Sequence, residues 1–175
     1  MGYRRKRVLV CAPQSDVKKY CFDDWAENVK NFTYPDYDVF LADNSLCRQY
    51  AMKNKYDYIL HLETDVFPPI DIIEKLMFER KPIIGALYQL SDNSARVPML
   101  NRISSDLDEY RVAIYGGYNN FMIAGKPVKT LSVGLGCVLI SRPVFSRFPF
   151  RHIEGASWFP DVVWINDVYA KKVPI

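Results

Sequence analysis

The sequence contains no run of apolar residues close to the roughly 20 that cross a membrane. Its first apolar stretch, residues 8–12, is also too short for the core of a signal peptide. With only 4 cysteines, 2 histidines and no Cys-x-x-Cys pair, the chain lacks the spacing of a zinc finger. We therefore expect a cytoplasmic protein in which Cys11 and Cys137, both within apolar runs, are buried free thiols.

Two nucleotide-binding motifs are missing as well. No Gly-x-Gly-x-x-Gly follows the first apolar run, which disfavours a nicotinamide or flavin site. No Gly-x-x-x-x-Gly-Lys-Ser/Thr occurs either, which excludes a P-loop. Repeats, low-complexity tracts and linkers between domains are also absent from the sequence.

Excess charge is small, because the formal net charge is only +3. So small an excess does not indicate a polyanionic partner, and we expect no nucleic acid to be bound. One local basic run does occur, formed by Arg4, Arg5, Lys6 and Arg7. It could touch an anionic membrane, or it could be a solvated segment leading into the first strand.

The composition of the chain, with 49% hydrophobic and 25% charged residues, is that of a globular protein. A length of 175 residues fits one domain, which we expect to span residues 1–175. Apolar runs at 8–12, 37–42, 57–62 and 82–88 predict strands, and patterned segments at 16–32, 44–54 and 68–80 predict helices between them. This alternation predicts an α/β fold with a mostly parallel central sheet and helices on both faces.

The second part of the chain is less regular. Residues 91–126 are polar, and we expect short strands and a mobile loop there. A further strand is predicted within 130–140, a short helix from residue 142 to about 148, and a final helix over 161–172.

Polar residues follow three of the predicted strands, where ligands bind in open parallel sheets. They lie in three segments: Pro13 to Asp16, then Asp43-Asn44-Ser45, and then Glu63-Thr64-Asp65. Asn44 or Ser45 could cap the next helix. In an extended chain Glu63 and Asp65 would point to the same side, and paired carboxylates suit Mg²⁺ or Mn²⁺. The same acids could instead form an ordinary turn before the helix that follows.

Six segments, taken in order, carry a resemblance to a known family. They are Val-Leu-Val-Cys-Ala-Pro at 8–13, Tyr-Pro-Asp-Tyr-Asp-Val-Phe-Leu-Ala-Asp-Asn-Ser at 34–45, Tyr-Asp-Tyr-Ile-Leu-His-Leu-Glu-Thr-Asp-Val-Phe-Pro-Pro at 56–69, Ile-Ile-Gly-Ala-Leu-Tyr at 83–88, Val-Gly-Leu-Gly-Cys-Val-Leu-Ile-Ser-Arg-Pro-Val-Phe at 133–145 and Phe-Pro-Asp-Val-Val-Trp at 159–164. Their order and spacing resemble the GT-A glycosyltransferases, especially the inverting family-two type. The resemblance implies a Rossmann-like GT-A sandwich that transfers a sugar from a UDP- or GDP-sugar to a glycan, lipid or protein acceptor. Residues 1–90 would then form the nucleotide-binding half and 91–175 the acceptor and catalytic half.

The resemblance also implies a role for each matching residue. For the donor, Ala12 and Pro13 would lie beside the base and ribose, and Asp43 would hydrogen-bond the donor with Asn44 nearby. Glu63 and Asp65 would hold Mn²⁺ or Mg²⁺, and Gly134, Leu135 and Gly136 would lie under the transferred sugar. Trp158 would form an apolar platform for a sugar, and Asp161 would be the general base. The Glu-Asp pair usual in the family reads Pro160-Asp161 here.

Two alternatives stay open. A sugar-nucleotidyltransferase uses a similar sheet and Mg²⁺, but it needs a glycine-rich basic loop where this chain has Ala-Pro-Gln-Ser at 12–15. A non-catalytic nucleotide-sugar-binding relative would explain the missing acid before Asp161.

Overall fold

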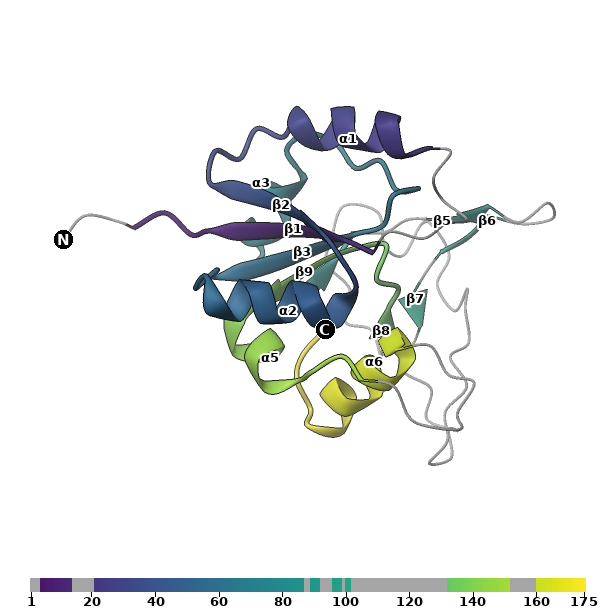
Figure 1. Cartoon of the computed structure of the whole chain (residues 1–175). Coiled ribbons are helices and arrows are strands. Elements are labelled where there is room, and N and C mark those ends of the chain that lie inside the picture. The colour runs from purple at the N-terminus through teal and green to yellow at the C-terminus, as the bar shows by residue number, and fades with distance from the viewer. Residues whose placement is uncertain are drawn as a thin grey trace.

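A five-stranded sheet with the strand order β2-β1-β3-β9-β4 forms the centre of the fold (Figure 1). The computed structural model describes residues 4–13, 21–86, 89–91, 96–98, 100–101, 132–151 and 160–175. The strands of the sheet are β1 (Val8–Ala12), β2 (Tyr37–Leu41), β3 (Tyr58–Leu62), β4 (Ile83–Gly85) and β9 (Cys137–Ser141). β1 pairs in parallel with β2 and β3, whereas β9 runs antiparallel to both of its neighbours, β3 and β4.

Helices cover both faces of this sheet (Figure 1). One face carries α1 (Phe22–Lys30) and α3 (Ile72–Phe78), and the other carries α2 (Asn44–Lys53), α5 (Arg142–Arg147) and α6 (Pro160–Ala170). Two small antiparallel pairs stand apart from the sheet, β5 (Gln89–Ser91) with β6 (Arg96–Pro98) and β7 (Leu100–Asn101) with β8 (Ser132–Val133). The predicted α/β class is therefore confirmed.

The alternation of side chains along a strand builds two cores, one on each face of the sheet. On one face Val8 and Val10 of β1 pack with Trp25 of α1, and on the other Leu9 packs with Ala51 of α2. All five are at most 1% exposed, and burying such a side chain stabilises the fold by roughly 1.5–3 kcal/mol. This two-sided burial explains why β1 reads as an unbroken apolar run.

Two expectations about the elements need correction. The helix expected from residue 68 begins only at Ile72, after Asp71. Ile70 therefore lies before the helix and is 47% exposed. Strand β9 lies antiparallel between β3 and β4, which a buried apolar run cannot reveal, since its pattern is the same in either direction. The helix expected over 16–32 is described as α1 from Phe22 onward, and its expected N-cap Asp16 lies outside the described residues.

Among the described residues, three other than glycine have a positive φ angle. They are Lys55 (60°), Arg80 (52°) and Lys172 (56°). Each follows a helix, after α2, α3 and α6 respectively, and its backbone N–H bonds back to a carbonyl of the last turn or of the cap. These left-handed residues end the three helices in the way that glycine more often does.

The last helix, α6, is fixed to the rest of the fold at its centre. Trp164 is fully buried, stacks on Phe150 with ring centroids 5.1 Å apart, and donates its indole N–H to the carbonyl of Phe148 at 3.2 Å. At the surface the Arg151 guanidinium donates to both carboxylate oxygens of Asp167, at 2.9 and 2.8 Å. Nowhere in the described part of the chain is a helix both long and apolar enough to cross a membrane.

Candidate functional site

The carboxyl ends of the parallel strands meet at one edge of the sheet. Ala12 is in register with Leu41, and Cys11 is in register with His61. The residues that follow β1, β2 and β3 therefore lie next to one another at the carboxyl-terminal edge of the sheet. Strand β9 starts at this edge because it runs the other way, with Cys137 opposite Leu62. The structure thus brings together four segments that the sequence singled out, 12–13, 43–44, 63–65 and 134–136.

A hydrogen bond joins two of these segments directly. The backbone N–H of Glu63 donates to the carbonyl of Gly136 at 2.9 Å. Gly136 is buried and belongs to a turn between β8 and β9, so the predicted strand over 130–140 is interrupted there. The turn that was expected under a transferred sugar therefore lies against the first of the two predicted metal-binding acids.

The segment that contains both acids is a tight turn, which corrects the expectation of an extended chain. Val66 N–H donates to the carbonyl of Glu63 at 3.1 Å, which closes a four-residue turn. Thr64 is buried inside this turn, and its carbonyl accepts the thiol of Cys21 at 2.9 Å. Asp65 is exposed and Glu63 is half-buried, so the two acids flank the buried Thr64 at the surface of the edge.

Asp43 caps helix α2, although the sequence suggested Asn44 or Ser45 for this role. Its Oδ1 accepts the backbone N–H groups of Ser45 and Leu46 at 2.8 and 3.0 Å. A carboxylate in this position satisfies two otherwise unpaired amides and interacts favourably with the helix dipole. Asn44 begins the helix, with its side chain half-buried beside the sheet.

A buried polar side chain at this edge, His61, bonds to two other segments, although its place in the sequence predicted only that it belongs to a strand. It is 2% exposed, with its Nδ1 hydrogen-bonded to the carbonyl of Leu135 and its Nε2 2.6 Å from Oδ1 of Asn44. Because a carbonyl only accepts, Nδ1 must carry a proton. His61 thus links β3, the start of α2 and the turn before β9. A histidine inside a run of apolar strand residues is the signal that could have found it.

For the remaining predicted site residues the structure gives the burial of Ala12 and Pro13 and the position of Asp161 in its helix. Ala12 is fully buried and Pro13 is half-buried at the end of β1. Asp161 falls in the first turn of α6, but its side chain, like all of Trp158, lies outside the described residues.

The described part of the chain contains no group of three or more His, Cys, Asp or Glu side chains that could hold a metal ion alone. The turn at residues 63–66 offers two carboxylates instead. Mg²⁺ is commonly bound by one or two carboxylates that are completed by substrate phosphates and water. The oxygen donors of Glu63 and Asp65 therefore fit a hard divalent cation that arrives with a phosphate ligand.

The four cysteines are all free and buried, as expected for Cys11 and Cys137. Burial raises the pKa of the Cys137 thiol to about 12. Burial also raises the pKa of Cys11, and the neighbouring Cys47 raises it further. The thiols of Cys11 and Cys137 therefore stay protonated near neutral pH and are part of the core.

Comparison with known proteins supports the fold and goes no further. No protein-family model matches the chain, and no curated protein matches it. Among solved structures, the chain is similar to the one described as the crystal structure of A197 from STIV, with a TM-score of 0.52 and 19% sequence identity. The match covers 96% of this chain and 78% of that chain. At this identity the likeness shows a shared α/β fold.

Proposed function

We propose that this protein is a glycosyltransferase of the GT-A type that takes its sugar from a nucleoside-diphosphate donor with the help of Mn²⁺ or Mg²⁺. The observation that carries the proposal is the meeting of the 63–66 turn with the 134–136 turn at the carboxyl edge, through the bond from Glu63 N–H to the Gly136 carbonyl. Two segments about 70 residues apart, each of which resembles the family in its sequence, are neighbours in space.

The strand order adds to this support. In this sheet the parallel strands β2, β1 and β3 are followed by the antiparallel strand β9. This order agrees with a Rossmann-like sandwich in which the strand from the second half of the chain lies below the bound donor. The antiparallel β9 delivers Gly134, Leu135 and Gly136 to the edge where Ala12 and Asp43 also lie. Ligands of open α/β sheets bind at this edge.

The chain's own residues divide the work as follows. Glu63 and Asp65 hold the cation, which when bound neutralises the diphosphate and makes it a better leaving group. Asp43 uses Oδ1 to cap α2, so Oδ2 is the oxygen that faces a base or ribose. Asp161, at the start of α6, takes the proton of the acceptor hydroxyl in an inverting reaction.

Donor binding tests the first half of this proposal. Thermal unfolding with UDP- and GDP-sugars, in Mn²⁺ or in EDTA, should show stabilisation that depends on the metal, because a ligand of the native state raises its stability. Asp65→Ala should abolish the metal dependence. Asp24→Ala, which removes an exposed carboxylate on α1, should leave it unchanged. If no nucleotide raises the unfolding temperature in Mn²⁺, the proposed donor site does not exist.

Turnover tests the second half. Asp161→Asn should slow sugar transfer by ~10²–10⁴, the usual contribution of a general base, while nucleotide affinity stays within a few-fold of wild type. Wild-type protein that binds nucleotide but transfers no sugar would instead support the non-catalytic relative.

A further inference from the structure

The opposite, amino-terminal edge of the sheet collects most of the chain's excess positive charge. Parallel strands start side by side, so the segments before β1, β2, β3 and β4, and the end of the antiparallel β9, all lie at this edge. These segments, residues 4–7, 36–38, 53–57, 79–82 and 141–142, form what we call the basic edge. Its nine cations are Arg4, Arg5, Lys6, Arg7, Lys53, Lys55, Arg80, Lys81 and Arg142, and its four acids are Asp36, Asp38, Asp57 and Glu79.

Backbone hydrogen bonds hold these segments side by side. Asp57 N–H donates to the carbonyl of Arg7 at 2.9 Å, and Arg142 N–H donates to the carbonyl of Asp57 at 2.8 Å. Ser141 N–H donates to the carbonyl of Pro82, also at 2.9 Å, which adds the segment before β4. The basic edge is therefore one continuous, rigid rim.

The basic edge holds a local excess of charge as a result. The whole chain has 23 Lys and Arg against 20 Asp and Glu, a net charge of only +3. The nine cations and four acids of the basic edge give that edge alone a formal net charge of +5, which exceeds the net charge of the whole chain.

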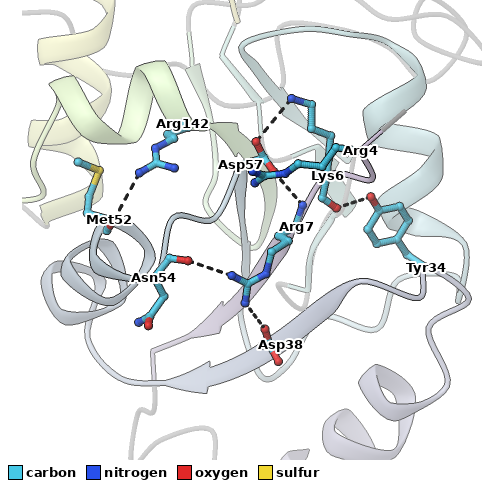
Figure 2. Close-up of polar contacts among 9 residues, drawn as sticks. All are labelled: Arg4, Lys6, Arg7, Tyr34, Asp38, Met52, Asn54, Asp57 and Arg142. Atoms are coloured by element: carbon cyan, nitrogen blue, oxygen red, sulfur yellow. Dashed lines mark hydrogen bonds and ion pairs between the residues drawn. The ribbon is translucent and has the colours of Figure 1, made fainter. Parts of the chain in front are cut away.

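Some of the basic-edge cations are used inside the fold (Figure 2). The Arg7 guanidinium donates to the carbonyl of Asn54 at 2.9 Å and to Asp38 at 3.2 Å, and its charge lies 4.3 Å from the centre of the Tyr56 ring. Arg4 and Lys6 share the carboxylate of Asp57, at 3.4 and 3.5 Å. The basic run of the sequence is thus anchored at Arg7.

Five other cations remain available to a partner. Within the described part of the chain, the following exposed side chains form no ion pair: Arg5, Lys53, Lys55, Arg80 and Lys81. Together they come from the segments before β1, β3 and β4, so they are spread along the rim.

A large apolar side chain stands beside these cations. Phe78, the last residue of α3, is 81% exposed, and Arg80 and Lys81 follow it directly in the turn that leads to β4. Phe78 is the most exposed large hydrophobic residue in the described part of the chain. An exposed aromatic ring among unpaired cations suits the interface of an anionic membrane, where the ring enters the headgroup layer and the cations stay at its surface.

We infer that the basic edge docks the protein on an anionic lipid surface, with Phe78 inserted and Arg5, Lys53, Lys55, Arg80 and Lys81 facing the headgroups. In this arrangement the carboxyl edge faces away from the lipid. The two edges of the sheet are separated by roughly 16 Å, the length of a five-residue strand. The inference does not depend on the proposed transferase activity, because no residue of the carboxyl edge takes part in it.

Sedimentation with vesicles tests the docking. The full chain should bind vesicles of phosphatidylcholine mixed with phosphatidylserine, fail to bind phosphatidylcholine alone, and be released by high salt. The triple variant Arg5→Gln, Lys55→Gln, Lys81→Gln should bind about 100-fold more weakly, since each cation near an anionic surface contributes ~1 kcal/mol. The control, Lys75→Gln, Lys171→Gln, Lys172→Gln, removes the same charge from exposed positions outside the basic edge and should keep near wild-type affinity.

Fluorescence tests the insertion. Phe78→Trp should gain a blue-shifted component on anionic vesicles beyond any change in the wild-type protein measured in parallel, which has three tryptophans, Trp25 and Trp164 being buried and Trp158 lying outside the described residues. Equal weakening by the two triple variants, or binding to neutral vesicles alone, would overturn the inference. Tighter binding to single-stranded RNA than to the anionic vesicles, with no change in the Phe78→Trp emission, would assign the basic edge to nucleic acid instead.

Discussion

At the scale of single residues, His61 offers a sharp experiment, because its two nitrogens serve different partners. The amide nitrogen of Asn can replace Nδ1, which faces the Leu135 carbonyl, whereas Gln reaches the position of Nε2, which faces Asn44. We expect His61→Asn to keep the turn before β9 in place and His61→Gln to loosen it. His61→Leu should lose both bonds, at a cost of about 1–3 kcal/mol for each buried group left unpaired.

Hydrogen exchange at the amide of Glu63 measures this difference, because that amide is bonded to Gly136 in the same turn. Exchange should be faster in His61→Gln and His61→Leu than in His61→Asn. Val168→Ala, a buried change in α6, controls for a general loss of stability. Equal exchange in the Asn and Gln variants would show that His61 does not position this turn.

A second residue-scale prediction concerns Asp57 and acid. Partial burial acts to raise its pKa, but the backbone N–H of Arg7 and the cations of Lys6 and Arg4 together hold the pKa below its ordinary value. The unfolded chain then binds a proton more readily than the folded one. The contribution of Asp57 is therefore complete above the unfolded pKa of about 4 and is lost as the pH falls through the lower folded pKa.

Urea unfolding at a series of pH values checks this prediction. Asp57→Asn should reduce the free energy of unfolding by about 1.5–3 kcal/mol at neutral pH, the range measured for hydrogen bonds to charged groups. The difference from wild type should shrink as the pH is lowered below about 4. A difference that stays constant down to strongly acidic pH would rule out a lowered pKa.

The sequence predicted the position of the acids at the carboxyl edge but not their local conformation. Strand ends can be read from apolar runs, so Glu63 and Asp65 were expected at the edge. The turn that contains them depends on the burial of Thr64 and its bond to Cys21, a contact between residues 43 positions apart. Asp43 was recognised as a strand-end acid, yet its role as cap of α2 depends on where the helix begins.

At the scale of elements, α6 should be held by its buried aromatic contact and only weakly by its surface ion pair. Trp164→Ala should cost about 3–5 kcal/mol, because it leaves a cavity against Phe150 and the Phe148 carbonyl without its donor. Arg151→Ala should cost less than about 1 kcal/mol, since the pair with Asp167 is exposed to water. Urea unfolding of both variants measures the two values, and similar losses would contradict this ranking.

Helices and strands differed in how well the sequence located them. Helix α1 lies within the predicted range 16–32, and its apolar residues Trp25 and Val29, four positions apart on one face, are both buried. The start of α3 was placed four residues early, because two prolines resemble a first helical turn while Asp71 precedes the actual one. The direction of β9 could not be predicted at all, since it follows from the path of residues far along the chain.

At the scale of the whole molecule, β9 makes the two halves of the chain interdependent. It comes from the second half and pairs with β3 and β4 of the first, with five and three residue pairs in register. A fragment of residues 1–86 should therefore leave β3 and β4 without a partner between them and fail to unfold cooperatively. Circular dichroism during thermal unfolding would test this, and a sharp transition in the fragment would contradict it.

The helix-ending residues with positive φ have a consequence for any attempt to make this protein more robust. Glycine adopts that conformation more easily, so Lys55→Gly and Arg80→Gly relieve strain of about 1 kcal/mol each. Both positions also lie on the basic edge, and each replacement removes a charge there. A sequence selected for thermostability alone would drift toward glycine at these two sites. If attachment to a membrane surface is selected instead, lysine or arginine should be kept at positions 55 and 80 in spite of the stability that the positive φ angle costs.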